Sequence, residues 1–251
     1  MSFTLNSYGT MLKVGLESGY KFKSFGMARD ASTDLICLLR HDVDADVCAA
    51  LEMAKIEHAL GVKSTYFFMT RSPIYNLMAR GNHRAVQEIL ALGHWIGLHY
   101  DQGFDPMSGH STEEWIESEA AMIERMFGMP IEAVSFHQPG SAVLQGNVST
   151  GRRINTYSKS HLPGFHYISD SNRCWRNMHP TEEFARKHFS RIQLLIHPMW
   201  WVYGDEKTTY AVWDKVIVSN FMQAQKQFLA TEGAYGGARK IVIKIDERDN
   251  V

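Results

Sequence analysis

Short apolar runs, many of them rich in β-branched residues, alternate along the chain with segments in which apolar residues recur at helical spacing. The apolar runs predict strands at 35–42, 64–69, 95–100, 131–137, 166–169, 192–197 and 240–245. The helical spacing predicts helices at 45–60, 83–92, 112–127, 182–189 and 211–230. Such alternation is typical of βαβ units arranged around a parallel sheet.

The length of the chain fits one domain. With 251 residues and a 45% hydrophobic composition it can bury a large core, and α/β barrels of this size usually form one unit. No linker, internal repeat or low-complexity tract divides the sequence. We therefore expect a single domain over 1–251, in which 1–34 add a helix and a turn at one end.

Ionisable residues follow most of the predicted strands at their carboxyl ends. They are Asp42 and Asp44 after the first strand and, after later strands, His99, His137, Asp170 and His197. In a parallel barrel these ends meet at one rim, and side chains on that rim are typically catalytic. The sequence therefore predicts one active site built from several distant segments.

The first strand ends in the densest charge of the chain, in the stretch RHDVDAD. Because alternate side chains of a strand share a face, Arg40, Asp42 and Asp44 are expected to point one way and His41 the other. Two neighbouring carboxylates repel each other unless they are compensated, which indicates a bound cation, Arg40, or both. Asp46 is expected instead to cap the helix that follows.

Charge and cysteine content argue against several classes of function. A formal net charge of -1 argues against nucleic acid as a partner. The cysteines, Cys37, Cys48 and Cys174, are odd in number and lack CxxC spacing, so we expect reduced thiols. No stretch reaches the roughly 18 consecutive apolar residues of a membrane span, and the first residues do not read as a signal peptide. These features predict a cytoplasmic protein without a membrane span.

Six short motifs between residues 35 and 203 together resemble the NodB-type polysaccharide deacetylase family, which is similar to carbohydrate esterase family four. They read RHDVD, GVKSTYFF, GHWIGLHY, FHQP, YISDS and LLIHPMWW. The branch that they resemble most is linked to O-antigen and surface-glycan genes. The resemblance implies a distorted (β/α) barrel of about seven parallel strands, with its active site on the C-terminal rim. It also implies a metal-dependent hydrolase that removes acetyl groups from N-acetylated sugars.

The same resemblance implies roles for individual residues. The two acids of the first motif fall on Asp42, as the catalytic base, and on Asp44, as a metal ligand. The histidine that opens the second motif, also a metal ligand, falls on His99. The last motif falls on Leu195 and His197, and it makes His197 the general acid.

One departure concerns the third metal ligand. The family places a second histidine four positions after the first, but Gly103 occupies that position. We expect His137, at the end of the neighbouring strand, to replace it. Asp101, His94 and His110 stay open as alternatives, although His94 fits a helix-end or core histidine better.

A carboxylate with two imidazoles suits zinc, and it also suits cobalt, iron or nickel. The residues expected to contact the substrate are Arg40, Tyr100, Asp170, Trp175 and Trp200. The resemblance also implies that Asp170 orients a basic partner, which the sequence leaves open among Arg40, Arg173 and Arg176. Trp200 and its neighbour Trp201 fit the core or an oligomer interface equally well, so a homo-oligomer is an open expectation.

The expected substrate is an amino sugar, either free or attached to a nucleotide or a lipid carrier. Arg152, Arg153 and Lys159 lie in the long loop 140–164 and suggest a grip on a phosphate group of such a carrier. Two other functions compete with N-deacetylation. The first is hydrolysis of another small amide, such as a formamido sugar, and the second is a catalytically silent carbohydrate-binding relative, which Gly103 favours.

Overall fold

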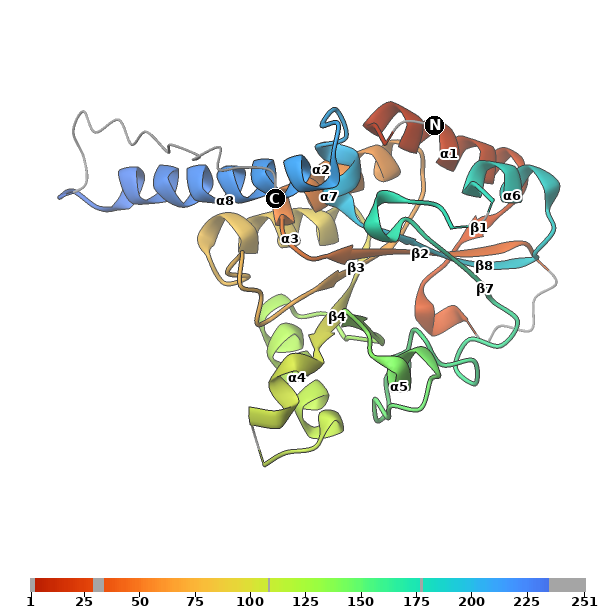
Figure 1. Cartoon of the computed structure of the whole chain (residues 1–251), viewed down its shortest axis with the longest axis horizontal. Helices are drawn as coiled ribbons and strands as arrows, with labels where there is room; N and C mark the ends of the chain where they lie inside the picture. Colours follow the sequence, from red (N-terminus) through yellow and green to blue (C-terminus); the bar gives the residue numbers. More distant parts are fainter. Residues whose placement is uncertain (1–2, 29–33, 108, 177, 235–251) are drawn as a thin grey trace, which may run out of the picture.

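A computed structural model of the chain describes residues 3–28, 34–107, 109–176 and 178–234. Its core is one parallel sheet, in which the strands lie in the order β6-β5-β4-β3-β2-β8-β7 and β1 pairs with the start of β2. The sheet curls (Figure 1), and no pairing joins β6 to β7 in the described ranges, so it forms an open half-barrel. The predicted distorted α/β barrel is therefore confirmed.

The strands of the sheet match the apolar runs of the sequence closely. They are β1 (Lys21–Phe22), β2 (Ile36–Val43), β3 (Thr65–Phe68), β4 (Trp95–Asp101), β5 (Ala133–His137), β6 (Ile154–Asn155), β7 (His166–Ser169) and β8 (Arg191–Ile196). Six predicted strands are confirmed, and the seventh, at 240–245, lies outside the described residues. The two-residue strands β1 and β6 were not predicted, because two residues give no periodic pattern.

The helices lie mostly between successive strands, as the βαβ pattern requires. The α-helices are α1 (Leu5–Glu17), α2 (Val47–Ala59), α3 (Arg80–Ala91), α4 (Thr112–Phe127), α5 (Ser141–Leu144), α6 (Pro180–Arg186), α7 (Pro198–Val202) and α8 (Thr209–Thr231), and the 3-10 helices are η1 (Phe25–Met27), η2 (Gln102–Met107) and η3 (Ser171–Arg173). Asp46 caps α2 as predicted, because its carboxylate accepts from the backbone N–H groups of Cys48 and Ala49.

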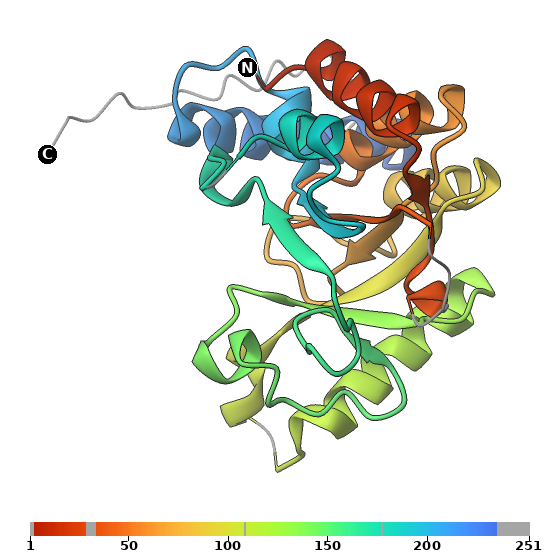
Figure 2. The ribbon, with the colours of Figure 1, turned by 90° about the vertical axis from the view of Figure 1, so that its right-hand side faces the viewer.

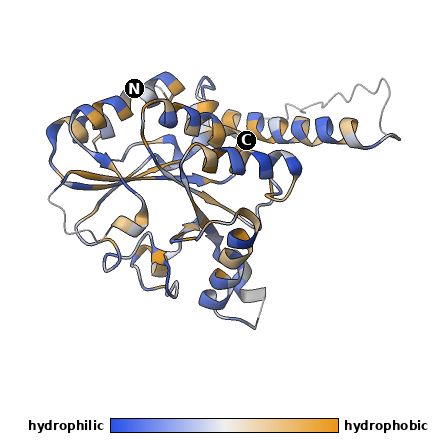
Figure 3. Ribbon diagram, turned by 180° about the vertical axis from the view of Figure 1, so that it is seen from behind, coloured by the Kyte–Doolittle hydropathy of each residue, from blue (hydrophilic) through white to orange (hydrophobic). Residues whose placement is uncertain are grey.

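The helices cover the convex face of the sheet. The helix of the N-terminal segment, α1, packs beside α6 and α2 (Figure 2). Two apolar clusters lie under the helices, one around β3, β4 and β5 and one around β2 and β8. Hydrophobic stretches follow the strands of the sheet, and hydrophobic and polar turns alternate along α8 (Figure 3).

A third, smaller cluster fills the concave face at the end opposite the strand tips. It contains Leu38 of β2, Phe67 of β3 and Ala133 of β5. Gly97 of β4 is required here, since a Cβ atom at that position would lie 2.4 Å from the ring of Phe67. Apolar side chains of the concave face thus lie mainly toward the N-terminal ends of the strands, where Thr65 and Gln193 are also buried, and polar side chains gather at the C-terminal ends.

Strand register fixes which polar side chains reach that concave face. Asp42 is the partner of Phe67, Phe67 of Gly97, and Leu195 of Arg40. Residues in register share a face, and side chains alternate along each strand. The concave face therefore receives, from one edge to the other, His137, Ser135, Asp101, His99, Asp42, Arg40, Leu195 and Ser169.

Helix α8 differs from the other helices in its packing. Only its first half lies on the body, and the rest projects beyond it (Figure 1). Its buried residues are Val212 and Val216. None of the helices in the described ranges combines the length and the apolar character that a bilayer crossing requires.

Candidate active site at the carboxyl ends of the strands

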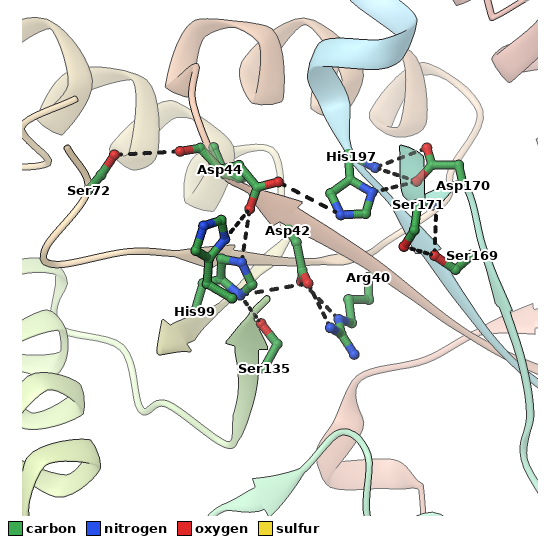
Figure 4. A network of polar contacts seen from close by, with 12 residues as sticks. Arg40, Asp42, Asp44, Ser72, His99, Ser135, Ser169, Asp170, Ser171 and His197 are labelled. Atoms are coloured by element: carbon green, nitrogen blue, oxygen red, sulfur yellow. Dashed lines mark hydrogen bonds and ion pairs between the residues drawn. The ribbon is translucent and has the colours of Figure 1, made fainter. Parts of the chain in front are cut away.

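Arg40 and Asp42 form a buried ion pair on the concave face of β2 (Figure 4). The guanidinium donates through Nε and Nη2 to the two carboxylate oxygens, at 2.8 and 2.6 Å. Burial alone would raise the pKa of Asp42, but the Arg40 charge outweighs it and lowers the pKa below its ordinary value. Asp42 is therefore held ionised, with both oxygens oriented.

The surroundings of Arg40 correct one expectation. Its side chain is fully buried, and its remaining donors reach Thr156 Oγ1 at 2.8 Å and the Tyr157 hydroxyl at 3.0 Å. A substrate therefore has no access to the guanidinium. Arg40 positions Asp42 and is not a substrate contact, because the loop after β6 closes over it.

Three imidazoles surround the carboxylate of Asp44, just beyond the end of β2. Nε2 of His99 and Nδ1 of His137 lie 3.0 and 3.2 Å from Oδ1, and Nε2 of His197 lies 3.8 Å from Oδ2. Burial would raise the pKa of Asp44, but hydrogen bonds with His137 and His99 lower it far below its usual range. The hydrogen bond with Asp44 in turn raises the pKa of His137, although burial opposes this.

Ligand atoms of Asp44, His99 and His137 all lie within 4.8 Å of one another. One carboxylate oxygen and two imidazole nitrogens at this separation could hold a metal ion. The cluster is partly open to solvent, since the side chains of Asp44 and His137 are 12% and 23% exposed. The predicted replacement residue thus lies beside the two ligands that the motifs imply.

Of the three alternatives to His137, Asp101 shares the concave face with it, and His94 and His110 lie elsewhere. Oδ1 of Asp101 accepts from the N–H of Gly103 at 2.8 Å, within the turn that takes the place of the family's second histidine. His94 lies on the opposite face of the sheet, bonded to the carbonyl of Ala54 at 3.0 Å, as expected for a core histidine. His110 is exposed beside Glu114.

Ser135 orients His99, a contact that the sequence did not single out. Its hydroxyl lies 2.6 Å from Nδ1 of His99, which leaves Nε2 facing Asp44. This is the arrangement that fixes the tautomer of a ligating histidine. Ser135 lies two residues before His137, so the period of a strand could have placed it on the same face.

On the other side of Asp44, the ring of His197 is held by Asp170 (Figure 4). Nδ1 of His197 lies 2.6 Å from Oδ1 of Asp170, and Trp201 donates through Nε1 to Oδ2 at 2.9 Å. Burial opposes the charged imidazole, but the Asp170 carboxylate outweighs it and raises the pKa of His197 to about 9. The basic partner of Asp170 is therefore His197, and not one of the three arginines expected from the sequence.

The aromatic residues expected at the substrate lie behind the site. Trp200 is buried against Trp213, because the short helix α7 turns it toward α8 and directs Trp201 to Asp170. Trp175 stacks on Phe3 and touches Trp201. Tyr100 points to the convex face, where it is fully buried; its hydroxyl donates to Asp105. These three positions do not support the expected substrate contacts.

The basic loop 140–164 is also occupied by structural contacts. Arg153 is buried and donates to Glu117 and Glu124 of α4, and Arg152 pairs with the same two carboxylates. Arg153 is therefore committed to structural contacts, and the grip on a phosphate stays a prediction for Arg152 and Lys159. The acidic face of α4 that binds them gave no such signal in the sequence, because its partners lie some 30 residues away.

The chain matches no protein-family model and no curated protein. Solved structures that align with it include a mutant, with restored enzymatic activity, of a CE4 family pseudoenzyme from Bacillus anthracis (15% identity, TM-score 0.41, 76% of this chain and 64% of that one). A peptidoglycan deacetylase from Bacillus subtilis aligns at 15% identity and a TM-score of 0.39, over 79% of this chain and 95% of that one.

A family 4 acetyl xylan esterase from Clostridium thermocellum, in complex with a cobalt ion, aligns at 13% identity and a TM-score of 0.38, over 78% of this chain and 91% of that one. The chain spans less than two thirds of the length of the Bacillus anthracis protein. At such identities and TM-scores these alignments carry no conclusion about activity, which has to rest on the side chains of the site.

Proposed function

We propose that this protein is a metal-dependent hydrolase that removes an N-acetyl group from an amino sugar or a glycan precursor. The observation that supports the proposal best is the meeting of Asp42, Asp44, His99, His137 and His197 at one end of the sheet. They come from four different strands or strand ends. Amide hydrolysis needs a base, an acid and a means to stabilise the oxyanion, and this set offers candidates for all three.

The metal would be held by Asp44, His99 and His137. The donor set suits zinc, and also cobalt, iron or nickel. The hydrogen bond from His99 to Ser135 fits this role, because it leaves Nε2 free for a metal. When bound, such an ion polarises the amide carbonyl and makes a coordinated water more acidic.

Asp42 would act as the general base. It lies 3.7 Å from the His99 ring and next to the metal cluster, yet its own oxygens are committed to Arg40 and not to the cluster. The pairing keeps Asp42 ionised, so that it can accept the proton of the attacking water. A general base in this position typically contributes about 10²- to 10⁴-fold to the rate.

His197 would act as the general acid. Asp170 binds Nδ1 and stabilises the protonated ring, so that Nε2 carries a proton and faces the side of Asp44 away from His99. Expulsion of an amine requires a proton on the departing nitrogen. His197 is the residue of the site that can supply it, and Trp201 holds Asp170 in place from behind.

The substrate class rests on the motif resemblance together with this geometry. An N-acetylated amino sugar, free or attached to a nucleotide or lipid carrier, supplies the amide that the site would cleave, and the O-antigen and surface-glycan branch is the context we propose. We place the protein in the cytoplasm. Since Trp200, Trp175 and Tyr100 lie away from the site, we assign no aromatic platform for the sugar ring.

One observation favours a second function. Gly103 stands where the family has a ligand, which is what a catalytically silent carbohydrate-binding relative would show. His137 weakens this alternative by bringing a second imidazole to the same carboxylate oxygen. A silent relative has no reason to keep a stoichiometric metal, so the metal content of the purified protein separates the two.

The test is acetate release by the full-length protein after dialysis against zinc. N-acetylglucosamine oligosaccharides and their nucleotide-linked and N-formyl counterparts are the substrates. We expect acetate release that is abolished by a chelator and by Asp42→Asn. Formate release without acetate release would reassign the site to another small amide. Stoichiometric metal with neither product would overturn hydrolysis of these substrates.

A further inference from the structure

Strand β7 carries a large aromatic side chain that is exposed to solvent. Among the large hydrophobic side chains that are exposed in the described ranges, Tyr167 is the only one that lies on a strand, and it is 42% exposed. Its register partner is Gln193, two residues before Leu195, which is the partner of Arg40. Tyr167 therefore lies on the concave face, which also carries the site.

The hydroxyl end of Tyr167 lies near the ion pair of Arg40 and Asp42. Burial and the neighbouring Tyr157 raise the pKa of this hydroxyl, and the charges of Arg40 and Asp42 act on it in opposite directions. The ring of Tyr157, whose own hydroxyl accepts from Arg40, lies 6.1 Å from the ring of Tyr167 between centroids. The hydroxyl end of Tyr167 is thus held inside the half-barrel, while part of its ring stays open to solvent.

Two hydroxyl groups lie further along the same strand, toward its carboxyl end. Ser169 follows Tyr167 by two positions and shares the concave face; its Oγ lies 2.5 Å from Oγ of Ser171 and accepts from the N–H of Ser171 at 3.0 Å. Both serines lie beside Asp170 and His197 (Figure 4). Strand β7 and its end thus offer an aromatic ring and hydroxyl groups on the side of the proposed general acid.

We propose that Tyr167, Ser169 and Ser171 form the subsite for the amino sugar that departs with the nitrogen, an inference that rests on the proposed hydrolysis. In that reaction His197 protonates the departing nitrogen, so the sugar ring has to lie on the side of His197, and β7 is the strand next to β8 on that side. A pyranose ring has an apolar face of C–H groups and a rim of hydroxyl groups. An exposed aromatic ring beside two hydroxyls matches both features.

The aromatic residues expected from the sequence leave this position to β7. Trp200 and Trp175 pack behind the site, and Tyr100 lies on the convex face. Tyr157 packs over the guanidinium of Arg40 at 4.9 Å. Tyr167 is therefore the aromatic residue of the concave face whose ring is most open to a sugar.

The test is the affinity of the zinc-loaded full-length chain for a tetrasaccharide of glucosamine, the deacetylated product, measured by calorimetric titration. Tyr167→Val removes the ring and keeps a residue that favours strands, whereas Tyr210→Val makes the same change at an exposed tyrosine of α8. We expect Tyr167→Val to weaken binding at least about tenfold. Tyr210→Val should leave binding unchanged, and Tyr167→Phe, which loses only a hydroxyl, should bind within about threefold of the wild type. Zinc affinity should be the same in all of these proteins.

Three results would overturn the subsite. They are an affinity of Tyr167→Val equal to that of the wild type, a wild type that does not bind the tetrasaccharide, and an equal loss of affinity in Tyr167→Phe, which would assign the effect to the hydroxyl.

Failure of the proposed hydrolysis gives a different result. A tetrasaccharide that binds through Tyr167 to a wild type without acetate release would support the subsite and remove the hydrolase. Acetate release together with an unchanged affinity of Tyr167→Val would support the hydrolase and remove the subsite.

Discussion

Strand β2 carries a histidine–carboxylate cluster on each of its faces, and the two clusters differ in how far solvent reaches them. On the convex face, Glu57 accepts from Ser64 at 2.5 Å, from Tyr66 at 2.9 Å and from Tyr8, and pairs with His41 at 2.6 Å. All of these groups are fully buried. The lone pairs of Glu57 are filled by the protein itself, as in a structural network.

The concave cluster has similar residue types but is not fully buried. Asp44 faces three imidazoles at 3.0 to 3.8 Å, and part of the cluster is open to solvent. The comparison teaches that solvent access, and not the residue types alone, distinguishes the candidate site from a structural network, since the buried His41 leaves Nδ1 without a hydrogen-bond partner and yet no solvent reaches it.

The largest effect is expected from Asp44→Ala, which removes the centre of the concave cluster. Loss of the carboxylate should abolish metal binding and lower kcat by at least about 10⁴-fold. Stability should change little, because the side chain lies at a strand end and is partly exposed. Metal analysis and acetate release check this, and retained metal with full turnover would show that the two clusters do not differ as described.

Asp42→Asn should remove the general base and leave the metal ligands in place. The amide keeps the shape of the side chain but cannot accept the proton, so kcat should fall by about 10² to 10⁴ while the metal stays bound. Metal stoichiometry measured together with kcat checks the outcome. Loss of metal in this variant would mean that the roles of Asp42 and Asp44 are exchanged.

Glu57→Gln tests the convex cluster. The NH2 group of the new side chain would face the hydroxyl donors of its neighbours and could not accept hydrogen bonds from them. The free energy of unfolding should therefore fall by about 3 kcal/mol. Metal affinity of the folded protein should not change. Chemical denaturation measures the effect, with Glu88→Gln as an exposed control that should alter stability by less than about 0.5 kcal/mol. A loss of metal affinity in Glu57→Gln would contradict the separation of the two faces.

Asp170→Asn should change the pH dependence of turnover. His197 must be protonated to act as an acid, and the raised pKa, about 9, keeps it so across neutral pH. Without the carboxylate the alkaline limb should move toward the ordinary histidine pKa of about 6.5. Protein stability should depend on pH in the same direction. The His197–Asp170 pair contributes fully to the free energy of unfolding below about pH 6.5, and this contribution is lost as the pH rises through 9. An unmoved alkaline limb would remove His197 as the acid.

The smallest effect is expected at Arg152. Its side chain is 71% exposed and pairs with Glu117 on the surface, so Arg152→Glu should change stability by less than about 1 kcal/mol. It should also leave KM unchanged for nucleotide-linked and free substrates. A rise in KM for the nucleotide-linked substrate alone would restore the phosphate grip first expected from the charge of this loop.

The sequence predicted the elements that carry their own periodic pattern. The strand bearing RHDVD, the alternation of Asp42 and His41 and the cap at Asp46 all follow from local rules. His137 could be anticipated because the strand order brings the tips of β4 and β5 together. Contacts between segments without a pattern could not be anticipated.

The partners of Arg40 and Asp170 show why. Thr156 and Tyr157 follow a two-residue strand that gives no signal, yet they close over the guanidinium. Trp201 and not Trp200 reaches Asp170 because a single short helix sets the direction of two adjacent indoles. Such choices depend on tertiary packing, which the order of residues along the chain does not reveal.

The most direct test of the account is the zinc affinity of His137→Ala compared with that of the wild type, with His110→Ala as the matched control, measured by competition with a chromophoric chelator. If Asp44, His99 and His137 hold the metal, the wild type binds one zinc ion, His110→Ala binds it equally well, and His137→Ala binds it at least about 100-fold more weakly. Zinc bound as tightly by His137→Ala as by the wild type would contradict the assignment of His137 as the third ligand.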